Sequence, residues 1–202
     1  MDVDRFYEQI IAGAAQAPNV RHALYIDVHT DLLDRYLDVV NAITPKQAAQ
    51  PVNRGDDQRT LAQLIGHIAE WDRFSILAAG DMLAGLKEPR SVRTIEGYVE
   101  LDDTILSFAS VDEFNQYQAE KQASWSWEQI CTLACSSAQA LHALFADDWL
   151  LNADRLEQTL PWKKRLKNGV ILEPLTMGWV LWLIELEHLG VEHASELHLY
   201  DD

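Results

Sequence analysis

The chain has 202 residues, 48% of them hydrophobic, so it is long enough for one sizeable domain with its own core. Its 32 Asp and Glu residues outnumber 16 Lys and Arg residues, which gives a formal net charge of −16. This balance argues against nucleic-acid binding, because neutralising phosphates requires clustered Lys and Arg, and it disfavours an anionic membrane surface. We therefore expect a single domain over residues 1–202, with neither nucleic acid nor membrane among its partners.

The N-terminus and the cysteines predict a cytoplasmic location. The first six residues, Met-Asp-Val-Asp-Arg-Phe, lack the basic and apolar regions of a signal peptide. The longest uncharged apolar run, 174–184, is too short to span a bilayer. Cys131 and Cys135 are the only cysteines, and their helical spacing predicts two small packed residues rather than a disulfide. The absence of a disulfide framework is typical of a reducing compartment.

The first part of the chain is predicted to form three helices. Residues 2–16 have the apolar spacing of a short amphipathic helix. Residues 20–43 form a longer one, because their apolar residues recur three and four apart. A third helix is expected over about 56–79. Its start carries Asp56-Asp57, where acidic residues favour the helix dipole, and Gly80 is a plausible C-cap.

The second part is predicted to contain a helix over 111–122, starting near Ser110 or Asp112, and a long helix from Trp125 to Phe145 with Ser126 as its N-cap. Residues 147–168 are interpreted as a connection that ends in an Asn168-Gly169 turn. The last helix is expected over 174–199, with Pro174 in its first turn.

Consecutive long helices predict an all-α fold of the four-helix-bundle type. In this interpretation the bundle has an extra N-terminal helix and a long connection between its second and third helices. No stretch, except 169–172, shows the alternating pattern of a strand.

Histidines lie among large apolar residues in two of these helices, Thr60–Phe74 and Trp179–Leu197. Histidines on facing helices are a common way for a bundle to build a metal site in its core. At about 100° per residue, His67 falls near the centre of an apolar stripe and should point inward. The same phase places Glu70 and Arg73 sideways or outward.

The stretch Arg59-Thr-Leu-Ala-Gln-Leu-Ile-Gly-His67-Ile-Ala-Glu-Trp-Asp resembles the second-helix motif of the DinB/YfiT-like superfamily. Other segments resemble its first, third and last core helices, namely 29–37, 111–115 with 126–130, and 175–197. The resemblance covers most of residues 20–199 and is specific at the second helix. It implies a bundle with a divalent metal site, a small-molecule substrate and a homodimer. Characterised members include thiol-dependent transferases and isomerases, and hydrolase-like proteins.

The family's ligands are usually one histidine on the second helix and a His-x3-His pair on the fourth. His67 matches the first of these positions. The fourth helix departs from the pattern, because His188 and His193 are five residues apart. Residues five apart on a regular helix are separated by about 140° and do not easily reach one ion.

Three interpretations of the fourth helix remain open. A π-bulge, eased by Gly190, would bring both histidines to one face, so that His67, His188 and His193 bind the metal. On a regular helix the metal ligands would instead be His67, His188 and Glu192, either alone or together with Glu185. Imidazole and carboxylate ligands suit Zn, Fe, Mn or Ni. In the third interpretation the ligand positions fall at Leu186 and Gly190, the site is lost, and His193 packs in the core.

Two further groups have alternative interpretations. His22 and His29 on the first long helix are either ordinary packed histidines or, for His29, a group that supports the metal site. Trp71, Trp179 and Trp182 either form the wall of a pocket or pack in the core.

The first functional hypothesis is a divalent-metal-dependent enzyme that transfers a thiol to a small molecule or hydrolyses one. A metal held by three protein ligands keeps a position open for water or substrate. No Gly-x-Ser-x-Gly elbow, phosphate loop or dinucleotide fingerprint competes with this site in the sequence. The alternative is a non-catalytic helical bundle that has lost its metal and binds a small ligand or a protein partner.

Overall fold

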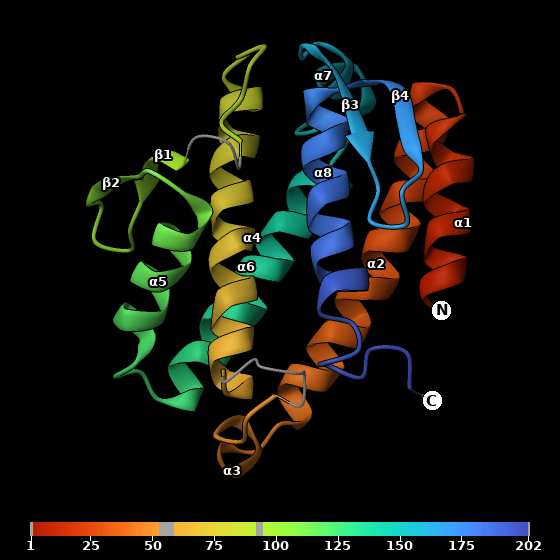
Figure 1. Ribbon diagram of the computed structural model, residues 1–202. Helices are drawn as coiled ribbons and strands as arrows, with labels where there is room; N and C mark the ends of the chain where they lie inside the picture. The colour runs from red at the N-terminus through yellow and green to blue at the C-terminus, as the bar shows by residue number, and fades with distance from the viewer. Residues whose placement is uncertain (1, 53–58, 92–94, 202) are drawn as a thin grey trace.

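The computed structural model describes residues 2–52, 59–91 and 95–201 (Figure 1). The elements in chain order are α1 (Val3–Ala14), α2 (Pro18–Ala42), α3 (Pro45–Ala48), α4 (Leu61–Leu83), β1 (Ile95–Val99), β2 (Ile105–Phe108), α5 (Val111–Gln122), α6 (Trp127–Ala146), α7 (Ala153–Glu157), β3 (Pro161–Arg165), β4 (Ile171–Thr176), α8 (Met177–Glu187) and the π-helical turn η1 (His188–Glu192). The described chain is therefore mostly helical, as expected. Two small antiparallel sheets, β1–β2 and β3–β4, correct the purely all-α expectation.

Side-chain caps fix where the central helices begin. The Thr60 hydroxyl accepts from the backbone N–H of Gln63, and the Gln63 side chain accepts from Thr60 N–H, which forms a capping box at the start of α4. The predicted caps Ser110 and Ser126 are confirmed at the starts of α5 and α6. The expected start of α4 at residue 56 was wrong, because the capping box sets it at Leu61. The Asp56-Asp57 pair lies outside the described residues.

Two predicted helix boundaries need correction. Gly80 is not the C-cap of α4, because the helix continues through it to Leu83. The last helix does not begin at Pro174, which lies in β4, but at Met177. The Asn168-Gly169 turn joins β3 to β4, and this hairpin occupies residues that were interpreted as a connection and as the first helical turn. After the π turn the chain continues in turns rather than in a regular helix.

The long helices α2, α4, α6 and α8 form the body of the molecule, with α1 outside α2 and with α5 and β1–β2 outside α4 (Figure 1). α4 packs against α5, α6 and α8, while α2 packs against α1, α6 and α8. A buried aromatic cluster, formed by Trp71, Phe74, Ile95, Tyr98 and Phe114, joins α4 to α5 and β1. Within the described ranges, no helix combines the length and apolarity needed to cross a bilayer.

Candidate metal centre

The π-helical turn η1 is the feature that shapes the candidate centre. The backbone N–H of His193 donates to the carbonyl of His188 at 3.2 Å, which is the i→i+5 bond of a π turn. Tyr200 donates its hydroxyl to the Gly190 carbonyl at 2.6 Å and so satisfies a backbone group inside the turn. The π-bulge between the two histidines, one of the three interpretations that the sequence left open, is present.

Gly190 lets this turn lie close to the first two helices. A Cβ atom at this position would meet Leu32 at 3.1 Å and Phe6 at 3.2 Å, and both of these side chains are fully buried. The position expected to ease the bulge is thus also one where a larger side chain would force the neighbouring core to move. Leu186 is buried as well. The two positions at which the third interpretation placed the lost ligands are therefore packing positions.

Three imidazoles converge between α4 and η1. His188 Nε2 lies 3.2 Å from His67 Nε2 and 3.2 Å from His193 Nε2, and one ligand atom from each histidine lies within 4.8 Å of the other two. These three residues are the only metal-ligating cluster of this kind among the described residues. Neither Glu185 nor Glu192 belongs to it. Glu192 instead pairs with Lys167 at 2.9 Å, so the geometry favours the first of the three interpretations.

Burial keeps His188 and His193 neutral. Desolvation is the main cause that lowers the pKa of His188 well below its usual value, and the neighbouring His193 and His67 lower it further. Burial also lowers the pKa of His193, although the Glu196 carboxylate opposes this effect. A neutral imidazole carries one N–H and one lone pair, and the lone pair is what a metal requires.

Glu196 determines which nitrogen of His193 faces the cluster. Its Oε2 lies 2.6 Å from His193 Nδ1, and its side chain is only 2% exposed. Because a carboxylate accepts, His193 donates through Nδ1 and presents the lone pair of Nε2 to the other histidines. A carboxylate behind a histidine is the usual arrangement for orienting a metal ligand.

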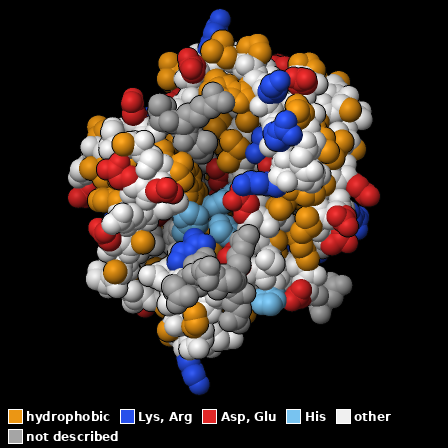
Figure 2. Space-filling view, viewed as in Figure 1, with side chains coloured by type: hydrophobic (Ala, Val, Ile, Leu, Met, Phe, Trp, Pro, Cys, Tyr) orange, Lys and Arg blue, Asp and Glu red, His pale blue; other side chains and the backbone are white. Residues whose placement is uncertain are grey.

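The cluster is accessible from one side. Figure 2 shows histidine side chains gathered in a hollow of the surface between α4 and α8. His67 and His188 are half-buried, whereas His193 is buried. The Trp71 ring forms a wall at 6.4 Å from the His67 ring and 6.3 Å from the His188 ring, measured between centroids. Arg59 is close enough to act electrostatically on both His188 and His193.

The other histidines and tryptophans singled out in the sequence serve the core. His22 Nε2 lies 2.9 Å from the Leu151 carbonyl, and His29 Nδ1 accepts from Trp182 at 3.2 Å. Complete burial lowers the pKa of His29 to about 3, so it stays neutral. Trp179 and Trp182 stack on each other at 6.1 Å, and Trp71 belongs to the buried cluster that joins α4 to α5 and β1, so the packing interpretation is confirmed for all three.

Two buried carboxylates between α4 and α8 were not predicted as a pair. Asp72 and Glu185 are each 8% exposed and influence each other electrostatically. Burial raises the pKa of Asp72 well above its usual value and that of Glu185 to about 7. Ser137 donates to Asp72, and Ser75 hydrogen-bonds to Glu185, which partly offsets the cost of burial.

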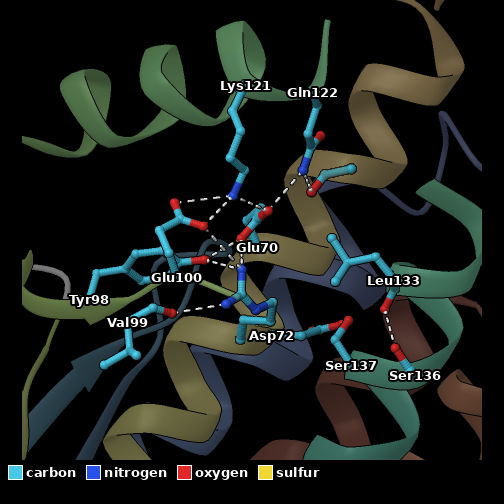
Figure 3. Close-up of polar contacts among 12 residues, drawn as sticks. Glu70, Asp72, Tyr98, Val99, Glu100, Lys121, Gln122, Leu133, Ser136 and Ser137 are labelled. Atoms are coloured by element: carbon cyan, nitrogen blue, oxygen red, sulfur yellow. Dashed lines mark hydrogen bonds and ion pairs between the residues drawn. The ribbon is translucent and has the colours of Figure 1, made fainter. Parts of the chain in front are cut away.

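A charged network on the other side of α4 corrects the prediction that Glu70 points sideways or out. Glu70 is fully buried and accepts hydrogen bonds from Arg73 at 2.8 Å, from Gln122 at 3.0 Å and from the Tyr98 hydroxyl (Figure 3). Lys121 lies 2.9 Å from it and 2.8 Å from Glu100. The i,i+3 spacing of Glu70 and Arg73 was the only signal of this network in the sequence.

The chain matches no known protein family, no curated protein and no solved structure in the comparisons made with each of these. The resemblance to the DinB/YfiT-like superfamily therefore rests on the residues of the α4 motif and on the order of the other segments.

Proposed function

We propose that this protein is a divalent-metal-dependent enzyme of the DinB/YfiT-like type that acts on a small molecule. The observation that carries the proposal is the convergence of His67, His188 and His193 on one point. The α4 motif, the order of the long helices and the π turn support it together, because the turn supplies a pair of ligands in place of the family's His-x3-His.

The distances fit a metal better than they fit hydrogen bonds alone. Zinc lies 2.0–2.1 Å from imidazole nitrogen, so two ligands at the tetrahedral angle are about 3.3–3.4 Å apart. The two measured Nε2–Nε2 distances are both 3.2 Å. Without a cation, His188 Nε2 can donate to only one of its neighbours, since a neutral imidazole has a single N–H. Three imidazole ligands suit Zn, Ni or Fe, whereas Mn prefers the carboxylate ligands of the second interpretation.

A divalent ion held by three imidazoles supplies a Lewis acid that activates a bound water or thiol. The residues of the chain hold and orient this group. Glu196 fixes the tautomer of His193, burial keeps His188 neutral, and the Trp71 ring shields one side of the centre. The hollow leaves the opposite side open to a small molecule. Thiol transfer and hydrolysis are the two reactions that we propose for such a centre.

Metal analysis of protein purified without chelator tests this proposal. We expect about one equivalent of divalent metal in the wild type and near loss in His67→Ala and His188→Ala. His198→Ala is the matched control, because His198 is 74% exposed on the same C-terminal segment and should not alter the metal content. Metal below about a tenth of an equivalent, with a melting temperature indifferent to added Zn²⁺ and Ni²⁺, would favour a non-catalytic binding protein instead.

The same proposal includes the DinB-type bundle topology and a homodimer, both implied by the family resemblance. Light scattering at micromolar concentration tests the dimer. A mass of two chains is expected, and the mass of a single chain would contradict this part of the proposal.

A further inference from the structure

A small polar recess lies beside His67, between α4 and α5. It has a volume of about 70 Å³ and is bordered by Arg59, His67, Glu70, Phe114, Asn115 and Gln118, among others. One water needs roughly 10–15 Å³ of such space, so the recess has room for a group of several atoms. The recess shares His67 with the histidine cluster, so the two features adjoin each other at this residue.

Gln118 is the unusual residue of this recess. Its side chain is 2% exposed, and among the described residues neither its Oε1 nor its Nε2 has a hydrogen-bond partner. An amide buried without partners costs about 1–3 kcal/mol, whereas an apolar side chain of the same size would not. A buried amide without partners that borders a recess is therefore a candidate for binding a ligand.

The neighbouring polar side chains already have partners. Gln122 donates to Glu70 at 3.0 Å and to the Gly66 carbonyl at 3.4 Å, while the Gln63 amide belongs to the capping box of α4. Asn115 accepts a hydrogen bond from Trp71 Nε1 at 3.1 Å. Gln118 thus offers an adjacent donor and acceptor that the described residues leave unused.

The recess is held open by the charged network of α4. Lys121 and Gln122 reach from α5 to Glu70 on α4 (Figure 3). Phe114, which is fully buried, packs against Trp71 with ring centroids 5.0 Å apart. These contacts fix α5 over α4, so the backbone that carries Gln118 is held beside the recess before any ligand binds.

The chemistry of Gln118 selects its partner. A carboxamide that offers a donor and an acceptor is complementary to a group that presents N–H and C=O on the same side. A primary amide and a lactam have this arrangement, and they form two antiparallel hydrogen bonds with the side chain. A ketone or a carboxylate offers acceptors only and leaves the Gln118 oxygen unpaired. Sites built on buried polar groups discriminate strongly against ligands that leave these groups unpaired.

We propose that the recess binds the primary amide or lactam group of a small molecule, with Gln118 as the residue that determines specificity. The further statement that this molecule is the substrate, with its reactive part at the three histidines, rests on the proposed function. The amide-binding step itself does not, because the histidine cluster contributes only the edge of the recess.

Three small probes of similar size test the proposal: acetamide, acetone and acetate. Each is titrated into ¹⁵N-labelled protein, and the dissociation constant is taken from the shifts of backbone and glutamine side-chain amide signals. We expect acetamide to bind about tenfold more tightly than acetone or acetate, and the Gln118 side-chain signals to shift. Equal affinity for the three probes would overturn the proposal.

Variants then test whether Gln118 causes the preference. Gln118→Leu should bind acetamide and acetone equally and should remain folded, since it removes an unpaired buried amide. Gln118→Glu keeps the size of the side chain but removes the donor, and should also lose the preference. Gln116→Leu, on the exposed face of α5, is the matched control and should keep it. A preference for acetamide that persists in Gln118→Leu would contradict the assignment.

Titrations of chelator-treated and Zn²⁺-loaded protein separate this inference from the proposed function. A preference that depends on Gln118 in both forms supports the amide site, even if metal analysis rejects the metal centre. Stoichiometric metal without any preference for acetamide would reject the amide site and leave the metal centre standing.

Discussion

Two polar clusters meet on α4 within one helical turn, and they differ in how fully their bonding capacity is used. Glu70 is surrounded by Arg73, Lys121, Gln122 and Tyr98, so its carboxylate is satisfied by donors from its own helix, from α5 and from β1. The histidine cluster that includes His67 brings three imidazole nitrogens together instead. A satisfied buried network has a structural role, whereas converging lone pairs call for a cation. Glu70 and its partners therefore form a structural scaffold on α4, and the histidines form the candidate site on the same helix.

The largest expected effect breaks the scaffold. Glu70→Leu removes the shared carboxylate and leaves Arg73 and Lys121 with Glu100 as their remaining acidic partner. Because removing one member of a buried ion pair costs 3–5 kcal/mol, and Glu100 remains, we expect a loss of about 3 kcal/mol in the free energy of unfolding. Urea denaturation measures it, with the exposed Glu8→Leu as control. A loss equal to that of the control would show that the network does not hold α5 and β1 on α4.

The second effect disturbs the geometry of the site. Gly190→Val places a branched side chain against Leu32 and Phe6, which lie 3.1–3.2 Å from the added Cβ. We expect overpacking to lower the free energy of unfolding by about 2 kcal/mol, measured by urea denaturation. We also expect weaker metal binding, measured by competition with a chelator, because η1 has to move. Gly80→Val is the matched control, since no atom lies within 4 Å of a Cβ at that exposed helical position. Wild-type metal affinity in the Gly190 variant would contradict the assigned role of the π turn.

The third effect comes from replacing the carboxylate that orients the ligand His193 by an amide of the same size. Glu196→Gln replaces the carboxylate that orients His193, and losing such a partner typically lowers metal affinity by about 10–100-fold. Competition with a chromogenic Zn²⁺ chelator measures the affinity. The control is Asp201→Asn, which alters a carboxylate beside the exposed His198. Unchanged affinity in Glu196→Gln would show that the Glu196 carboxylate does not support His193 as a metal ligand.

The last effect is a pH dependence of the free energy of unfolding that comes from Glu185. Burial raises the pKa of this carboxyl from 4.5 to about 7, so the folded protein keeps a proton that the unfolded chain has lost between these pH values. The contribution of this group to stability is therefore fully present below about pH 4 and is lost as the pH rises through about 7.

Glu185→Gln should remove that loss. We expect the metal-free variant to be about 2 kcal/mol more stable than the wild type at pH 8, with a much smaller difference at pH 5. Melting curves at the two pH values measure it, and Glu8→Gln should show no such divergence. Equal stability of variant and wild type at pH 8 would rule out a raised pKa at Glu185.

The sequence predicted the features that depend on local spacing. The mostly helical fold, the N-cap Ser126 and the start of α5 near Ser110 all follow from neighbouring residues, and each is present. The π-bulge around Gly190 was one of three alternatives that the spacing of the histidines left open. The inward direction of His67 followed from the apolar stripe of its helix.

The features that depend on distant partners were missed. Glu70 looks like a surface residue in its own helix, and only Lys121 and Tyr98, far along the chain, show why it is buried. The β3–β4 hairpin replaced the expected first turn of the last helix because residues 161–165 pair with 171–176. No local pattern signals that the Gln118 amide lacks a hydrogen-bond partner among the described residues, since this depends on what surrounds it in space.

The central claim is that three imidazoles hold one divalent ion. Anomalous diffraction at the metal's absorption edge, from crystals of protein purified without chelator and soaked in Zn²⁺, tests it most directly. We expect a single strong anomalous peak about 2.0–2.1 Å from the Nε2 atoms of His67, His188 and His193, and we expect this peak to be absent in His188→Ala. No peak between these histidines, in crystals that diffract well enough to resolve their rings, would contradict it.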